Sequence, residues 1–209
     1  MIVKVLPLGT LEANCYYLSD GKTAVLVDPG CYTADLRAFL QTANPAPSAI
    51  LLTHGHFDHM CGAIEICNQL KLPVYIGAAD KPCLYSAEQN LAVFVGGYTR
   101  EPLRTDVEVN TLVGGETLEI GTFCVKTIAL AGHTAGGMGY LCENMLFCGD
   151  TVFRGNIGRT DLPGGDYQTL LNSIKRLCRL PNDTLLYSGH GEPTTLSQEK
   201  ETNYYFGVI

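Results

Sequence analysis

The sequence lacks several features that mark other classes of protein. Charged residues make up only 17% of the 209 positions, the formal net charge is −7, and no run of lysine and arginine occurs. Because a nucleic-acid surface needs clustered basic residues, we expect no nucleic-acid partner. No stretch reaches the roughly 18 consecutive apolar residues of a membrane helix. The apolar stretch before Gly9 is short and typical of a strand, so we expect no signal peptide, no membrane partner and a cytoplasmic protein.

Paired cysteine motifs are also missing. The chain has nine cysteines, an odd number, and no Cys-x-x-Cys pair. These features and the length of the chain argue against a disulfide scaffold or a cysteine-rich zinc site. Most of the cysteines lie in apolar stretches, such as FCVKTIAL (123–130) and MLFCGD (145–150), so we expect free, buried thiols. Such thiols indicate a reducing compartment.

The chain does contain a mixture of strand-like and helix-like stretches, without a linker or a repeat. Hydrophobic residues make up 46% of it, which is enough for a sizeable core. Asp20-Gly21 is typical of a β-hairpin, and Thr33 and Asp166 are typical N-caps of amphipathic helices. Strands are predicted at 1–8, 14–19, 23–30, 49–53, 72–77, 106–109, 116–120, 122–130, 136–142, 144–148 and 184–189. Helices are predicted at 33–43, 61–70, 81–94 and 165–180.

This mixture predicts a layered α/β protein that forms one domain over residues 1–209. Two packed sheets with helices outside them are one possible arrangement, and a single parallel sheet is the other. Hydrophobic periodicity alone does not distinguish these two arrangements.

Histidine is scarce, yet three of the five histidines fall in the segment THGHFDH at 53–59. Residues i and i+2 of an extended chain project to the same side, so His54 and His56 can face one ion, and Gly55 leaves room between them. Asp58 and His59 follow as the chain turns into a helix. Imidazole and carboxylate are ligands that zinc takes when thiolate is absent. The segment therefore predicts part of a metal site.

The other two histidines, His133 and His190, also follow predicted strands and lie beside glycines. A single histidine in this position is commonly an ordinary hydrogen-bonding loop residue. Five imidazoles, however, exceed the needs of one four-coordinate ion and suit two ions with a bridging carboxylate. Asp150, directly after the predicted strand at 144–148, is the candidate bridge. Aspartate is also a common cap or turn residue there, so spacing alone leaves its role open.

Four segments make the sequence resemble the metallo-β-lactamase-fold hydrolases, most closely the small glyoxalase II-like (hydroxyacylglutathione hydrolase-like) type. They are THGHFDH (53–59), AGHTAGGMGY (131–140), GDTVFRGNIGRTDLPGGD (149–166) and GHGEPTT (189–195). The resemblance implies a single-domain, four-layer αββα sandwich with the site at one edge between the sheets. It assigns one ion to His54, His56 and His133 and a second to Asp58, His59 and His190, with Asp150 and a hydroxide bridging them.

The resemblance also implies a reaction. The bridging hydroxide would hydrolyse a small-molecule thioester, such as an S-(2-hydroxyacyl)glutathione, and Asp58 would orient this hydroxide as a catalytic residue. The cofactors would be two divalent metal ions per chain, with zinc expected and iron or manganese as alternatives.

Arg159 lies close to the position of a lysine that contacts the glutathione carboxylate in the family, which implies a substrate-binding role. The alternative is that Arg159 pairs with Asp161 to brace its loop. Glyoxalase II proper also has a C-terminal helical domain that helps to hold glutathione, and this sequence does not include it. Phe153, Tyr140 and Tyr167 are candidate pocket walls, with core packing as the plainer expectation for each.

The same fold supports other reactions. The main alternative is a persulfide dioxygenase, which resembles this chain at GRTD (158–161) but uses one iron held by two histidines and an aspartate. Lactone hydrolysis is a further alternative, because lactonases share the ligand set. Two other classes of this fold fit the ligands less well. β-Lactamases commonly use a cysteine ligand, whereas this chain has Asp58 and His59, and flavodiiron proteins carry a glutamate where this chain has His56. A metal-binding module without activity is the non-enzymatic alternative.

Overall fold

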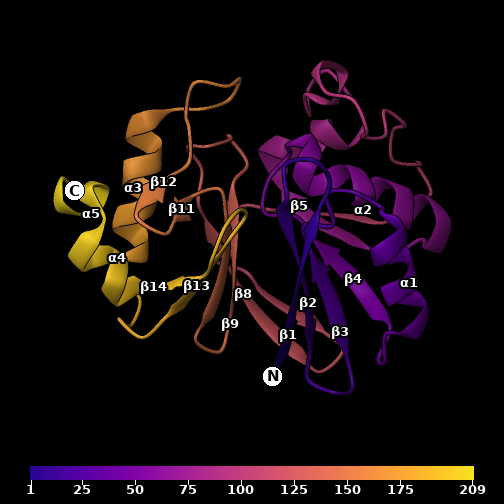
Figure 1. Ribbon diagram of the computed structural model, residues 1–209, viewed down its shortest axis with the longest axis horizontal. Coiled ribbons are helices and arrows are strands. Elements are labelled where there is room, and N and C mark those ends of the chain that lie inside the picture. Colours follow the sequence, from indigo (N-terminus) through magenta and orange to yellow (C-terminus); the bar gives the residue numbers. More distant parts are fainter.

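The N-terminal half of the chain forms the first of two six-stranded sheets in the computed structural model, which describes residues 1–209 (Figure 1). Its strand order is β1-β2-β3-β4-β5-β6; the first three strands pair antiparallel and the last four pair parallel. The elements are β1 (Ile2–Leu8), β2 (Ala13–Ser19), β3 (Ala24–Val27), α1 (Ala34–Thr42), β4 (Pro47–Leu51), α2 (Phe57–Leu70), β5 (Val74–Gly77) and β6 (Val109–Leu112), with the 3-10 turns η1 (Ala78–Leu84) and η2 (Ala92–Phe94) between β5 and β6.

The C-terminal half forms the second sheet, with the order β14-β13-β10-β9-β8-β7. Only β10 and β13 pair parallel in it. The elements are β7 (Thr117–Ile120), β8 (Phe123–Ala129), β9 (Met138–Cys142), β10 (Met145–Gly149), the hairpin β11 (Val152–Phe153) and β12 (Asn156–Ile157), α3 (Tyr167–Leu177), β13 (Leu185–Ser188), β14 (Thr194–Thr195), α4 (Leu196–Thr202) and α5 (Tyr204–Gly207).

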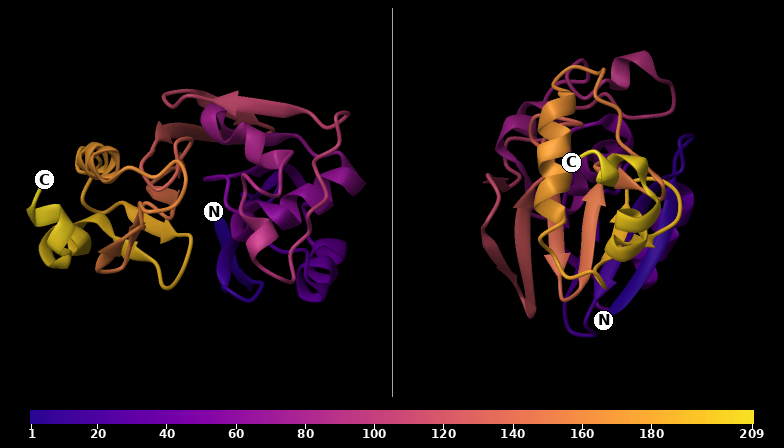
Figure 2. Two further views of the ribbon diagram at one scale, coloured as in Figure 1. Left: turned by 90° about the horizontal axis from the view of Figure 1, so that it is seen from above. Right: turned by 90° about the vertical axis from the view of Figure 1, so that its left-hand side faces the viewer.

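Three buried clusters separate four layers. Along β2, Cys15 and Tyr17 belong to the cluster between the first sheet and its helices, whereas Tyr16 and Leu18 belong to the cluster between the two sheets. This alternation follows from the two-residue period of a strand that is covered on both faces. A third cluster joins the second sheet to α3, α4 and α5. The helices of the two halves lie on opposite sides of the molecule (Figure 2).

These layers confirm the predicted αββα sandwich and exclude the single parallel sheet. Burying each large apolar side chain stabilises the fold by about 1.5–3 kcal/mol relative to its exposure, so the three clusters hold the layers together. No helix combines the length and the apolar character that crossing a membrane requires.

Local signals in the sequence explain several element boundaries. The Thr33 hydroxyl accepts a hydrogen bond from the Leu36 amide, and the Asp166 carboxylate accepts one from the Thr169 amide, so both predicted N-caps are confirmed. Asp20 and Gly21 lie in the turn between the antiparallel strands β2 and β3, as predicted. All nine cysteines are free.

Other predictions were wrong in detail. Residues 81–94 form no single helix, because the chain makes two separate 3-10 turns there. The strand predicted at 106–109 lies at Val109–Leu112, since Val107 packs into the helix-side core before the strand begins. Helix α2 begins at Phe57 rather than at 61. Cys124 is exposed, because alternate residues of β8 face away from the core.

Candidate metal centre

The seven predicted ligands come from four loops that follow strands, and the structure brings all seven together. β4 leads into His54 and His56, β8 into His133, β10 into Asp150 and β13 into His190. Asp58 and His59 lie in the first turn of α2, directly after the β4 loop. Side chains at such strand ends meet at one edge of the sandwich, which is where sheet proteins commonly build sites.

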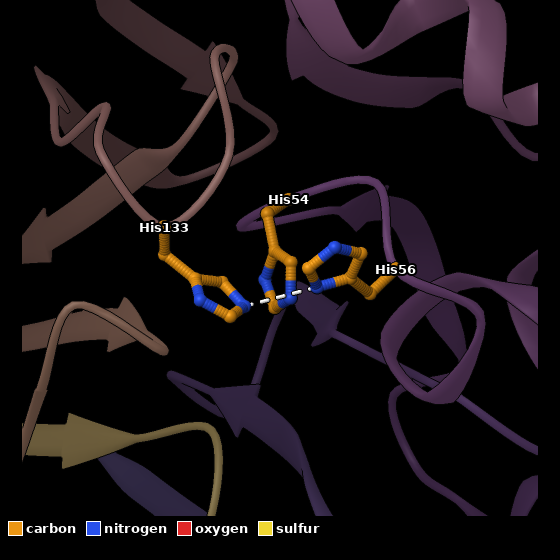
Figure 3. Close-up of side chains that lie close together, drawn as sticks. All are labelled: His54, His56 and His133. Atoms are coloured by element: carbon orange, nitrogen blue, oxygen red, sulfur yellow. Dashed lines mark hydrogen bonds between the residues drawn. The ribbon is translucent and has the colours of Figure 1, made fainter. Parts of the chain in front are cut away.

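His54, His56 and His133 form the first cluster. One ring nitrogen of each lies within 4.8 Å of the others, and Nδ1 of His56 lies 2.9 Å from Nε2 of His133. Figure 3 shows the three imidazoles converging from two separate loops. All three residues are buried, so little of each ring is exposed to bulk water.

Asp58, His59 and His190 form the second cluster. Nε2 of His190 lies 3.3 Å from Nε2 of His59 and 3.3 Å from Oδ2 of Asp58. Nε2 of His59 lies 3.6 Å from the same Asp58 oxygen. The two histidines and the carboxylate therefore face a common point beside the first cluster.

Asp150 lies between the two clusters. Its Oδ1 is 3.5 Å from Nε2 of His59, and its Oδ2 is 3.6 Å from Nε2 of His133. Gly189 makes this position possible, because a Cβ there would lie 2.0 Å from Oδ1 of Asp150. Oδ2 also lies 3.7 Å from Nε2 of His190, so the carboxylate contacts residues of both clusters, as a bridging ligand requires.

In four of the five imidazoles, the ring nitrogen that faces away from the donor cluster contacts an oxygen atom. Such outer contacts fix the tautomer and leave the inner nitrogen free for a metal. The Thr53 hydroxyl donates to Asp28 and is therefore an acceptor for the His54 ring. The outer contacts are His54 Nδ1 to Thr53 Oγ1 (3.1 Å), His59 Nδ1 to Asp28 Oδ2 (3.1 Å), His133 Nδ1 to the Arg159 carbonyl (2.7 Å) and His190 Nδ1 to the Leu11 carbonyl (3.1 Å).

Two buried atoms of the centre indicate that its residues fit metal ions. Nε2 of His54 and Oδ1 of Asp150 have no hydrogen-bond partner, and buried polar atoms are rarely left without one. Zinc–nitrogen bonds of about 2.0–2.1 Å at tetrahedral angles place two ligand nitrogens about 3.3 Å apart. The nitrogen pairs here lie 2.9 and 3.3 Å apart, which is close to that spacing.

The ionisation of the centre also suits cations. Burial lowers the pKa of His54, and neighbouring imidazoles lower it further. Burial and His133 lower the pKa of His56 to about 3, so both rings are neutral donors. Burial disfavours a charged His59, but Asp58, Asp150 and Asp28 outweigh it and raise its pKa to about 10. His59 therefore stands among carboxylates that attract positive charge, whether from a proton or from a metal ion.

Sequence reasoning missed two carboxylates that support the centre. Asp28 accepts hydrogen bonds from the Thr53 amide (2.7 Å) and from His59, and with His54 and His59 it forms a third group of possible ligands. Asp80 accepts hydrogen bonds from Gly55, Thr134 and Gly136 and so ties the two loops that carry the first cluster. Asp28 follows a buried strand, as Asp150 does, and this shared context is the signal that could have revealed it.

Gly55 also has a packing role that the sequence did not predict. A Cβ at this position would lie 2.7 Å from Sγ of Cys83 and 3.2 Å from Cβ of Asp80. The glycine therefore allows the loop to pack against η1 and to donate its amide to Asp80 at 2.9 Å.

A cavity of about 640 Å³ opens over the metal centre. None of the three aromatic residues predicted as pocket walls lines this cavity. Tyr140 is buried between the sheets, and Tyr167 is 48% exposed. Phe153 lies outside the lining, with its ring 6.3 Å from the ring of His190. The walls come instead from residues that periodicity did not single out, namely Leu11, Phe57, Leu91, Phe94, Val95, Leu162 and Pro163.

Arg159 lines the cavity and is also engaged in an ion pair. Its guanidinium makes two contacts of 2.7 Å with the Asp161 carboxylate, and both side chains are largely exposed. The alternative of an ion pair with Asp161 is therefore present in the structure. Each partner shifts the pKa of the other. Arg159 lowers the pKa of Asp161 to about 2, and Asp161 raises the pKa of Arg159.

Comparisons with known proteins agree with this geometry. The metallo-beta-lactamase superfamily model matches residues 8–190, so the chain belongs to that superfamily. It is 31% identical to hydroxyacylglutathione hydrolase GloC of Haemophilus influenzae over 97% of each chain. The structure of BLEG-1 B3 metallo-beta-lactamase matches with a TM-score of 0.90 at 36% identity, over 98% of this chain and 99% of that one.

A further solved structure bears on the metal. TTHA1623 in a di-iron-bound form matches with a TM-score of 0.85 at 37% identity, over 97% of this chain and all of that one (100%). The fold and the His/Asp metal-binding motif of this chain are accordingly those of a metal-dependent hydrolase.

Proposed function

We propose that this protein is a binuclear metal-dependent hydrolase that cleaves small-molecule thioesters, a class that includes S-(2-hydroxyacyl)glutathione. The observation that carries the proposal is the pair of donor clusters with Asp150 between them at the floor of the cavity. The similarity to GloC supports a thioester as the substrate. The free thiols support a reducing, cytoplasmic setting, where glutathione and other thiols occur.

The first ion would be held by His54, His56 and His133 and the second by Asp58, His59 and His190, with Asp150 between them. When bound, two divalent ions lower the pKa of water toward about 7 and polarise a carbonyl oxygen. Zinc is the ion we expect. The di-iron form of TTHA1623 makes iron the first alternative, and manganese is the next, because imidazole and carboxylate ligands accept all three.

The residues of the chain orient the reaction. Asp58 lines the cavity with a carboxylate whose pKa His59 and His190 lower against the effect of burial, so it is an anionic acceptor that can orient the attacking water. The water oxygen forms a bond to the thioester carbon, the carbon–sulfur bond breaks, and the products are a carboxylate and a thiol. The thiolate leaves readily, because a free thiol has a pKa of only about 8.5.

β-Lactam hydrolysis is a second candidate, and the similarity to BLEG-1 favours it. Both reactions add water to a carbonyl carbon and therefore need the same centre. They differ in the group that leaves, which is a thiolate in one and a ring nitrogen in the other. The dioxygenase alternative needs one iron and three protein ligands, whereas this centre offers seven donors.

Metal analysis combined with a substrate panel tests the proposal. We expect about two metal ions per chain and metal-dependent release of thiol from S-lactoylglutathione or other thioesters. Chelation should abolish this release, and added zinc or iron should restore it. Activity that survives complete metal removal contradicts the proposal. Faster turnover of a β-lactam or a lactone, or oxygen uptake with glutathione persulfide and one iron per chain, would favour the corresponding alternative.

A further inference from the structure

The walls of the cavity are apolar and unusually exposed. Leu11 is 48% and Phe94 is 78% exposed, although both are large hydrophobic residues that line the cavity. Leu11 comes from the loop between β1 and β2, and Phe94 comes from η2. Leu91, Val95 and Leu162 extend the same surface. A contiguous apolar surface beside a catalytic centre is typical of a surface that an apolar ligand covers.

This apolar wall is built into the fold. Asn90 accepts a hydrogen bond from the Phe57 amide through its carbonyl (2.9 Å) and another from the Ala92 amide through its side chain (2.9 Å). The Phe57 ring packs against Tyr98 at 4.7 Å. Leu91 has a φ of 71°, a strained conformation for a leucine, and the surrounding contacts hold it there. The wall is therefore attached to the first turn of α2, which carries Asp58 and His59.

Lysine and arginine are nearly absent from the lining. Arg159 is its only lysine or arginine, and both Arg159–Asp161 contacts are 2.7 Å long. Glutathione carries two carboxylates and one ammonium group, which need charged or strongly polar partners. The cavity thus offers much apolar surface, and the one arginine in its lining is already paired with a carboxylate.

From these observations we infer that the preferred substrates are thioesters with an apolar aliphatic or aromatic acyl group and that the charges of glutathione contribute little to their recognition. The inference rests on the thioester hydrolysis proposed above and specifies its substrate class. Water cleaves the carbon–sulfur bond in the same way, and the products are an apolar carboxylate and a thiol.

Four thioesters, made from two acyl groups and two carriers, test this inference with the metal-loaded enzyme. The acyl groups are lactoyl and hexanoyl, and the carriers are glutathione and neutral N-acetylcysteamine. We expect kcat/KM to rise at least about 10-fold from the lactoyl to the hexanoyl thioester on either carrier. The reason is that each methylene group missing from a substrate in a hydrophobic pocket lowers kcat/KM by about 10-fold or more. Glutathione should give no advantage above about threefold. A smaller acyl effect, or a larger advantage for glutathione, overturns the inference.

Affinities provide a readout that does not depend on turnover. S-hexylglutathione and S-hexyl-N-acetylcysteamine are uncleavable thioethers, and we expect calorimetry to give dissociation constants within about threefold of each other. Phe94→Ser should weaken both about 10-fold, whereas Tyr204→Ser, at a residue that is 73% exposed and outside the lining, should change neither. Unchanged affinity in Phe94→Ser, or clearly tighter binding of S-hexylglutathione, overturns the inference.

The two experiments separate the inference from the proposed function. A metal-loaded protein that cleaves none of the four thioesters contradicts thioester hydrolysis. The thioether affinities then still decide whether the cavity prefers an apolar group. Both Phe94 and Tyr204 are exposed, so neither substitution removes a core contact, and circular dichroism checks that each variant is folded.

Discussion

Asp58 and Asp150 have different roles in the proposed hydrolase, although both are aspartates of the same centre. Asp150 lies between the clusters and has one buried oxygen without a hydrogen-bond partner, which suits a bridging ligand. Asp58 contacts only the second cluster, and both carboxylates line the cavity. A carboxylate in the position of Asp58 can hold a metal and still reach a water in the cavity. The environment of each side chain, not its chemistry, separates the roles.

At the residue scale, Asp58→Asn tests the proposed catalytic role. The amide keeps the shape of the side chain but lacks its charge, so we expect kcat for a thioester to fall about 10²–10⁴-fold. Metal content should be measured on the same sample, because Asp58 is also a proposed ligand. Asp183→Asn, on the exposed turn before β13, is the matched control and should keep wild-type kcat. A kcat for Asp58→Asn within about threefold of wild type would refute the role.

At the scale of secondary-structure elements, helices position the loops that carry the centre. α2 places Asp58 and His59 in its first turn, where backbone amides and the helix dipole stabilise negative charge. α3 supports the loop of His133: the Ser173 hydroxyl donates to the Ala131 carbonyl at 2.6 Å, and the Asp166 amide donates to the Gly132 carbonyl at 2.9 Å. The outer layers therefore help to hold the ligands in place.

Ser173→Ala tests this support by α3. It removes a partly buried hydrogen bond and leaves the Ala131 carbonyl without that partner, so we expect the free energy of unfolding to fall by about 0.5–1.5 kcal/mol. Urea denaturation of metal-free protein measures this loss, with an unchanged slope against urea concentration. Ser197→Ala, on the exposed face of α4, is the control and should change stability by less than about 0.5 kcal/mol. Equal stability of the two variants would show that the hydrogen bond contributes nothing.

At the scale of the whole molecule, burial controls the chemistry of the nine thiols. Cys15, Cys67 and Cys148 lie inside the helix-side clusters of the two halves. Burial raises the pKa of Cys67 to about 12, and burial, with Asp150 adding to it, raises the pKa of Cys148 to about 12. Cys124 alone among the cysteines is exposed. Thiolate is the reactive form, so reactivity should follow exposure.

Thiol labelling of the native, metal-loaded protein checks this arrangement. We expect one thiol, Cys124, to react rapidly with Ellman's reagent, and the thiols with raised pKa values to react far more slowly. All nine should react after unfolding in guanidinium. Cys124→Ser should abolish the fast phase. A fast phase that persists in this variant would mean that a further thiol lies on the surface of the folded protein.

Much of the fold and of the candidate centre could be predicted from the sequence. The Thr33 and Asp166 caps and the Asp20-Gly21 turn depend on short-range contacts, which residue order fixes directly. The THGHFDH segment likewise places several donors together through local geometry alone. Where local geometry competed with packing, as in residues 81–94, the prediction failed.

The sequence by itself determined the local elements, the histidine-rich motifs at strand ends and, through them, the family of the protein. Only the tertiary structure decided which donors share a cluster, that Asp28 and Asp80 support them, and that Leu11, Leu91 and Phe94 line the cavity. The physical reason is distance along the chain. The Leu11 carbonyl contacts Nδ1 of His190, which lies 179 positions later in the chain, and such contacts arise only when the two sheets pack against each other.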